Sequence, residues 1–275
     1  MKAIKFTGLV LAAALLSVKV MAQTEELKVP LSDPGKPYKL SVALISGSIT
    51  ITGYDGKEVI IEASTDGQAK RKHENRDEAR QGGMKRINTN GGLDITAKEK
   101  NNEVTIGSDI PMRNTSLNIK IPQGVSNLKI DCVNNGAITV SNVSGNIEAT
   151  NINGSVLIND VSGSVVASSV NGNIRVSFKS IDSKAPMAFS TLNGNVDLTL
   201  PANLKANVKL KSDRGGIYTD FDITAADKES KVTRSTKDGM YRVTIDETVY
   251  GKINGGGPEL MMKTMNGSLY LHKAK

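Results

Sequence analysis

The stretch NINGSVLINDVSGSVVASSVNGNIRVSF, residues 151–178, repeats a nine-residue unit that begins at a glycine. Glycines fall at 136, 145, 154, 163 and 172, and asparagine and serine alternate in the position before them. Asparagine or serine followed by glycine is typical of a turn, because glycine tolerates a positive φ and the polar side chain can hydrogen-bond the turn. Replacing Gly154 or Gly163 by valine is therefore expected to destabilise the protein, since a β-branched residue is strained at positive φ.

Apolar residues in each unit follow the glycine at the second, fourth and seventh positions. The second and fourth side chains point to one side of a short strand. The seventh is predicted to return to the interior after a bend, as at Val143, Ile152, Val161 and Val170. One such unit cannot bury its apolar side alone, so the units are predicted to stack about 4.8 Å apart around a continuous core.

Two arrangements of the units are consistent with this pattern. Asn-Gly is a strong hairpin signal, so the units could pair as antiparallel hairpins. The additional inward residue at the bend and the alternation of Asn-Gly with Ser-Gly favour a single-domain, all-β parallel β-solenoid (β-helix or β-roll-like), with two corners and about 18 residues per coil. The predicted corner residues are Asn135, Gly136, Gly145, Asn153, Gly154, Gly163, Asn171, Gly172, Asn193, Gly194, Asn266 and Gly267.

The same signature recurs outside the regular block, at 45–64, 192–198, 213–221 and 265–271. Two strands across an Asn-Asn turn are predicted at 93–108. A strand, a proline-containing turn and a second strand are predicted at 116–133 and again at 196–213. A β-strand-repeat domain is therefore predicted over 41–275, after a lead-in at 23–40. Two charged, core-poor stretches depart from the pattern: 66–87 is predicted to be a solvated loop, or alternatively a contact loop, and 224–240 a solvated excursion.

The first 22 residues, MKAIKFTGLVLAAALLSVKVMA, have a basic start, a short apolar run and small residues before Gln23. This pattern predicts a secretory signal peptide, with an uncleaved anchor as the alternative. No later stretch reaches the length of a transmembrane helix. The chain is therefore expected in the periplasm, on the outer-membrane surface or outside the cell.

Composition restricts the chemistry that the chain can carry. The net charge is +7, aromatic residues make up 4% and no single basic face is evident, so nucleic-acid binding is not expected. Cys132 is the single cysteine, which excludes an intramolecular disulfide and a thiolate cluster. It stands at an alternating position and is predicted to be a small buried side chain.

No catalytic residue, metal site or cofactor is predicted. The two histidines, His73 and His272, are far apart in the sequence, and no known hydrolase or nucleotide-binding motif is present. A calcium roll would place aspartate in its turns, and Asp160 alone stands inside the regular block. The charged residues that an enzyme on this scaffold could use have no 18-residue pairing: Glu148, Asp160, Arg175, Asp182 and Asp197.

The runs IKIPQG…LKIDCVNNGAITVSNVSGNIEATNINGSV, FSTLNGNVDLTLPA and INGGGPELMMKTMNGSLYLHK resemble the putative adhesin family of secreted bacterial β-strand-repeat proteins, over about residues 40–275. The resemblance implies a non-catalytic adhesive or structural module of the cell envelope. The long faces of the stacked strands would offer a repetitive surface for contact with surface glycans or envelope proteins. Two alternatives stay open. One is a carbohydrate-active lyase or hydrolase, which an acid pair facing one groove would favour. The other is a periplasmic accessory protein of an envelope regulatory system.

Overall fold

The structure is a computed structural model that describes residues 24–65, 95–108, 114–134, 136–182, 184–225, 232–237, 240–245 and 248–275. These residues form strands, turns and loops, without a helix, so the chain is all-β in the part described. None of that part could cross a bilayer as an apolar helix. The predicted signal peptide and the predicted charged loop at 66–87 lie outside it.

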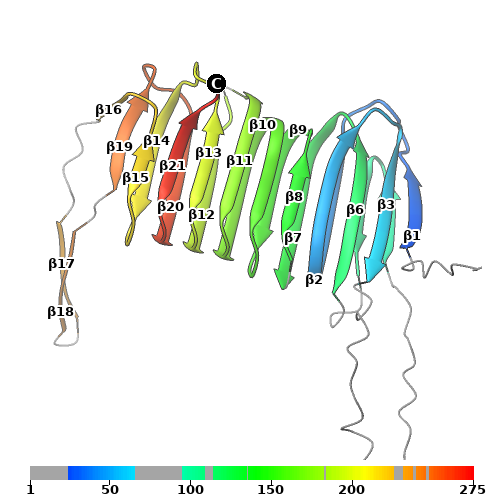
Figure 1. The fold of residues 1–275 in the computed structure, drawn as a ribbon, viewed down its shortest axis with the longest axis horizontal. Helices are drawn as coiled ribbons and strands as arrows, with labels where there is room; N and C mark the ends of the chain where they lie inside the picture. The colour runs from blue at the N-terminus through cyan, green and yellow to red at the C-terminus, as the bar shows by residue number, and fades with distance from the viewer. Residues whose placement is uncertain are drawn as a thin grey trace, which may run out of the picture.

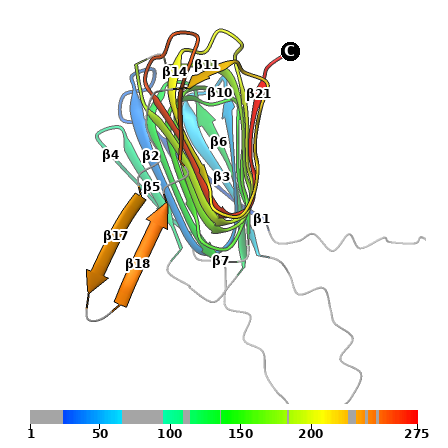
Figure 2. The same cartoon turned by 90° about the vertical axis from the view of Figure 1, so that its left-hand side faces the viewer.

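The strands stand side by side in one long row, and the view along the row shows two layers around a narrow interior (Figures 1 and 2). Parallel pairing dominates both layers, and each coil consists of one strand from each layer. Two long strands bend, so that each contributes one part to each layer: β2 (Tyr38–Tyr54) and β10 (Val156–Asn171).

The first layer runs in the order β1–β3–β6–β2–β8–β10–β11–β13–β21–β15. Its other strands are β1 (Thr24–Pro30), β3 (Glu58–Thr65), β6 (Thr115–Pro122), β8 (Ile138–Ser141), β11 (Ile174–Ile181), β13 (Val196–Leu200), β15 (Ile217–Thr219) and β21 (Leu269–Lys273).

The second layer runs in the order β4–β5–β2–β7–β9–β10–β12–β20–β14–β19–β16. Its other strands are β4 (Thr96–Lys100), β5 (Glu103–Gly107), β7 (Val125–Asn134), β9 (Ser144–Asn151), β12 (Met187–Asn193), β14 (Ala206–Ser212), β16 (Ile223–Ala225), β19 (Val249–Ile253) and β20 (Glu259–Asn266).

The central repeats pair in parallel, so the hairpin alternative is wrong for this block. Val156 of β10 lies opposite Ile138 of β8 on one side and Ile174 of β11 on the other. Stacked side chains such as Asn171 and Asn153 are 18 residues apart. The stack is solenoid-like here, but the next step is longer: Asn193 is 22 residues from Asn171, because a longer loop connects β11 to β12.

The order of the coils does not follow the sequence throughout. β2 lies between β6 and β8 in the first layer and between β5 and β7 in the second. β20 lies between β12 and β14, and β21 between β13 and β15. Two segments distant in sequence are thus inserted between coils that the rest of the chain forms, which a simple sequential solenoid does not predict.

Antiparallel strands cover both ends of the stack. β3 and β1 continue the first layer beyond β6, and β19 and β16 continue the second layer beyond β14. β4 pairs with β5 across Asn101 and Asn102, whose φ values of 56° and 59° fit a type I′ turn. The predicted Asn-Asn turn is confirmed, and the antiparallel ends interrupt further parallel stacking.

The sequence predicts an irregular, solvated excursion at 224–240, and the predicted irregularity is wrong for the described residues of this stretch. It contains the end of β16, all of β17 (Val232–Lys237) and the first residue of β18 (Met240–Ile245). β17 and β18 form a separate antiparallel hairpin. The β-branched residues of VTRSTK and the alternating Tyr241, Val243 and Ile245 of MYRVTI are compatible with strands despite the high charge of the surrounding sequence.

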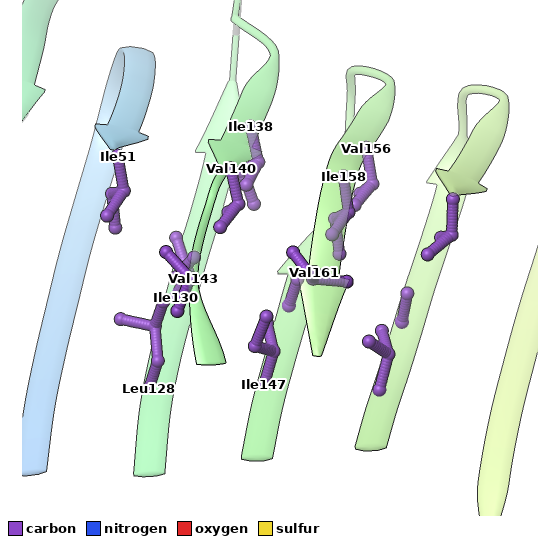
Figure 3. Packing of buried hydrophobic residues seen from close by; sticks show 14 of the residues in the cluster. Ile51, Leu128, Ile130, Ile138, Val140, Val143, Ile147, Val156, Ile158 and Val161 are labelled. Carbon is purple, nitrogen blue, oxygen red and sulfur yellow. The ribbon is translucent and has the colours of Figure 1, made fainter. Parts of the chain in front are cut away.

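Branched aliphatic side chains fill the interior in columns along the row. Ile138 and Val156 lie at the same level of successive coils, as do Val140 and Ile158 (Figure 3). The predicted inward seventh residue is confirmed at Val143 and Val161, which are buried. The prediction is wrong at Ile152 and Val170, whose side chains are each 39% exposed. The residue directly before the corner points inward at the Ser-Gly corners and outward at these two Asn-Gly corners.

Close stacking leaves no room for a Cβ on the glycines of either corner, but the backbone conformations of Gly154 and Gly163 differ. At the Ser-Gly corner, Gly145 and Gly163 have φ values of 149° and 119° and lie opposite each other. At the Asn-Gly corner, φ of Gly154 is outside the positive region, so the backbone argument for it is wrong. A Cβ on Gly154 would lie 1.9 Å from the carbonyl oxygen of Gly136, which shows that close stacking requires glycine there.

Candidate functional site

The asparagines of the Asn-Gly corners form a continuous ladder of side-chain hydrogen bonds, here called the asparagine ladder. Each amide NH₂ donates to the amide oxygen of the coil before it, over 2.9, 2.9, 2.7 and 2.6 Å. Arg214 donates to the last amide oxygen at 3.3 Å. The members are Asn134, Asn153, Asn171, Asn193 and Asn266. Asn134 takes the place predicted for Asn135, which lies outside the described residues.

Inside the same corner, a second column of side chains satisfies the glycine carbonyls. Ser169 donates to Gly154, Thr191 to Gly172 and Thr264 to Gly194, over 3.1, 2.9 and 2.8 Å. Cys132 belongs to this column, because its Sγ lies 3.2 Å from the carbonyl oxygen of Gly47. The predicted burial of Cys132 is confirmed, and burial raises the pKa of its thiol.

A row of apolar side chains runs beside the asparagine ladder on the outside of the second layer. We call it the corner row; its members each precede a ladder asparagine or, in β2, the equivalent serine. Ile45, Ile152, Val170, Leu192 and Met265 are 39–44% exposed. With Val133 they stand one per coil at matching positions: Ile45, Val133, Ile152, Val170, Leu192 and Met265. The surface at this corner is thus a repeating pair of an apolar side chain and an amide.

Replacing Asn171 by aspartate tests the direction of the ladder. A carboxylate cannot donate to Asn153 Oδ1, so two acceptors would face each other, and we expect a loss of about 1–2 kcal/mol in the free energy of unfolding. Asn173→Asp is the matched control, because Asn173 Oδ1 only accepts from the backbone N–H of Asn195. Denaturant unfolding of both variants measures the difference; equal stabilities would contradict the ladder.

A second surface lies on the outside of the first layer, over β11, β13, β21 and β15, which stand next to one another (Figure 1). Tyr218 and Tyr270 lie opposite each other on β15 and β21 and stack with ring centroids 5.1 Å apart and planes at 11°. The ring of His272 is parallel to that of Tyr270, with centroids 6.2 Å apart. Tyr218 is 55% exposed.

Charged groups surround these rings. Arg175 Nε lies 3.2 Å from Asp197 Oδ2. Asp197 Oδ1 is also 3.8 Å from His272 Nε2, and Asp220 Oδ2 is 3.2 Å from His272 Nδ1. The imidazole therefore lies between two carboxylates from different parts of the chain. We call these six residues the tyrosine–carboxylate cluster: Arg175, Asp197, Tyr218, Asp220, Tyr270 and His272.

The cluster borders a hollow of about 400 Å³. Asn173, Arg175, Asn195, Asp197, Tyr270 and His272 line it. This volume lies within the range of small-molecule sites, and donors, acceptors and an aromatic ring converge on it. Within the described residues, no group of three or more histidine, cysteine, aspartate or glutamate side chains could hold a metal ion.

The other charged residues considered in the sequence stay apart from this cluster. Glu148 lies 3.9 Å from Lys129 on the second layer. Asp160 has a φ of 52°, and its backbone N–H donates a hydrogen bond to Oγ of Ser177. Asp182 accepts from the N–H of Lys184 at another corner. Of the five, only Arg175 and Asp197 meet, at a separation of 22 residues rather than 18.

A signal for the cluster was present in the sequence. Arg175, Asp197 and Tyr270 each stand four residues after a ladder asparagine. Alignment on the Asn-Gly corners would have placed these three side chains in one outward line, whatever the length of the intervening loops. Tyr218 has a weaker signal of the same kind: it stands three residues after Gly215, as Tyr270 does after Gly267, but Arg214 replaces the corner asparagine.

Comparison with known proteins gives a family match and two structural likenesses. Residues 150–254 match the family described as Toastrack DUF4097. A putative cell adhesion protein from Clostridium sporogenes ATCC 15579 aligns over 92% of this chain and 100% of its own, at 10% identity and a TM-score of 0.42. A putative adhesin from Bacteroides fragilis NCTC 9343 aligns over 92% and 98%, at 12% identity and a TM-score of 0.42.

No curated protein matches the sequence. The family match covers a narrower part of the chain than the predicted resemblance at 40–275, and it includes the regular coils from β10 to β13 together with the strands up to β19. The predicted resemblance to a family of β-strand-repeat proteins is confirmed, since residues 150–254 are similar to the family described as Toastrack DUF4097.

Proposed function

We propose that the protein is a non-catalytic adhesive module of the cell envelope, which contacts its partner surface through the Asn-Gly corner. The observation that carries this proposal is the corner row beside the asparagine ladder. Large contiguous apolar patches on soluble proteins mark interaction surfaces, and the corner row places five side chains at 39–44% exposure along one corner, with Val133 between Ile45 and Ile152. A repeating surface of this kind fits a partner that is itself extended.

Export of the chain is part of the proposal. The basic and then apolar pattern of the first 22 residues supports it. The lack of a disulfide is compatible with an exported location, because stacked coils and buried backbone hydrogen bonds stabilise the fold without one. Fractionation of the producing cells checks this; the full-length protein retained in the cytosol would contradict export.

Binding of the labelled chain to whole cells and envelope fragments tests the adhesive function. The double variant Val170→Lys, Leu192→Lys is expected to lose binding by tenfold or more, because two charges would interrupt the corner row. Leu27→Lys, Val249→Lys is the matched control, since both side chains are 41–42% exposed and lie outside the row. Unchanged binding by the Val170 and Leu192 variant, at unchanged thermal stability, would exclude the corner row as the contact surface.

One observation favours a glycan-active enzyme as a second candidate. Asp197, which lines the hollow, and Asp220, which does not, both lie within 4 Å of His272, and two carboxylates beside an imidazole are groups that acid–base catalysis can use. Incubation with a panel of polysaccharides, followed by measurement of released reducing ends and of unsaturated products, separates the two. Turnover that His272→Ala abolishes would replace the non-catalytic proposal.

A further inference from the structure

The tyrosine–carboxylate cluster is a second exposed surface that the corner contact does not use. It lies on the outside of the first layer, whereas the corner row lies on the outside of the second. We infer that the cluster is a binding site for a neutral saccharide unit. The inference rests on the proposed adhesive function, since it names a ligand class for an envelope protein.

The aromatic part of the cluster fits the apolar face of a sugar ring. Tyr270 and His272 extend from β21 into the lining of the hollow, and their rings are parallel within 8°. Tyr218 stacks behind Tyr270 and fixes the orientation of that ring. A tyrosine presents an apolar body and a polar tip, so it can pack against C–H groups while its hydroxyl reaches a neighbouring oxygen.

The polar part of the cluster fits vicinal hydroxyl groups. The Nε of Arg175 pairs with one oxygen of Asp197, and its terminal NH₂ groups are additional donors in a fixed plane. The carboxylate oxygens of Asp197 are acceptors, and its side chain is only 27% exposed. A hydroxyl can donate to a carboxylate and accept from a guanidinium at once, so the pair presents both functions to one diol.

The charge of the site selects against acidic ligands. Asp197 and Asp220 both approach His272, and Asp222 lies nearby at the limit of contact with Lys273. In the ion pairs of this region, Arg175 and Lys273 face three carboxylates, those of Asp197, Asp220 and Asp222. An anionic sugar would meet a net negative surface, whereas a neutral sugar would meet paired charges.

Saturation-transfer difference NMR on the full chain tests this inference. The probes are neutral cello-, malto- and chito-oligosaccharides of three or four units, with sulfated and uronate oligosaccharides as the acidic set. We expect at least one neutral series to bind and the acidic set to bind at least tenfold more weakly. Tyr270→Ala and Asp197→Asn are expected to lose tenfold or more in affinity, while Tyr270→Phe retains binding because it keeps the ring.

The outcomes separate this inference from the proposed function. Neutral oligosaccharide binding that Tyr270→Ala leaves unchanged would overturn the site, as would preferential binding of the acidic set. No saccharide binding by a chain that still adheres to cells through the corner row would overturn the inference and leave the adhesive function standing. Saccharide binding without any cell adhesion would overturn the adhesive function and keep the site.

Discussion

Deletion of residues 259–275 is expected to unfold the second half of the stack rather than to shorten it by one coil. These residues form β20 and β21, which lie between β12 and β14 and between β13 and β15. The deletion removes four fully buried apolar side chains: Leu260, Met262, Leu269 and Leu271. At about 1.5–3 kcal/mol each, the loss is about 6–12 kcal/mol. That is comparable to the whole stability of a domain, about 5–15 kcal/mol.

Thermal unfolding followed by far-ultraviolet circular dichroism and limited proteolysis measure this loss. Removal of β1 (Thr24–Pro30) is the matched control, because β1 is an edge strand that pairs with β3 alone. We expect the control to unfold at nearly the normal temperature. A synthetic peptide of residues 259–275 should restore part of the protease resistance of the truncated chain, since its slot is bordered by strands on both sides.

An unchanged unfolding temperature in the truncated chain would show that β12–β13 and β14–β15 can close on each other directly. The insertion of β20 and β21 would then be dispensable for stability.

The nine-residue period was sufficient to predict the corners, because turn chemistry and alternation are local. Asn153 and Asn171 belong to Asn-Gly corners, whereas Gly145 and Gly163 belong to Ser-Gly corners. Stacked units could therefore be aligned from the sequence alone. The inward or outward position of Ile152 could not be predicted, because an apolar residue beside a corner has the same pattern in both orientations.

The order of the coils could not be predicted for a different reason. Each coil presents the same alternating apolar pattern, so no feature of β20 or β2 specifies its neighbours in the row. The register depends on contacts between residues far apart in the sequence, such as Asn193 and Asn266, which are 73 residues apart. The corner spacing could align Arg175, Asp197 and Tyr270, but that Tyr270 and His272 lie beside Asp197 depends on the position of β21 next to β13.

Replacement of Gly154 by alanine is expected to lower the free energy of unfolding by about 3 kcal/mol or more, which exceeds the usual cost of one added methyl group. The new Cβ would lie 1.9 Å from the carbonyl oxygen of Gly136 and 2.7 Å from Nδ2 of Asn151. The carbonyl belongs to the stacked backbone and cannot move without separating two coils. The same contact recurs along the corner, where a Cβ on Gly172 would lie 2.1 Å from the carbonyl oxygen of Gly154.

Two further glycines separate this steric cause from backbone strain. Gly107→Ala is the control for added volume, because its Cβ would find Ala43 O at 3.8 Å and its φ is not positive; we expect a change within about 1 kcal/mol. Gly124 has φ 94° and open space around its Cβ, so Gly124→Ala should cost about 1–2 kcal/mol from strain alone. Denaturant unfolding of the three variants should rank Gly154 well above Gly124, and Gly124 above Gly107. If Gly154→Ala cost no more than Gly124→Ala, the coils could separate at this corner without loss, and the glycines there would not be required by close stacking.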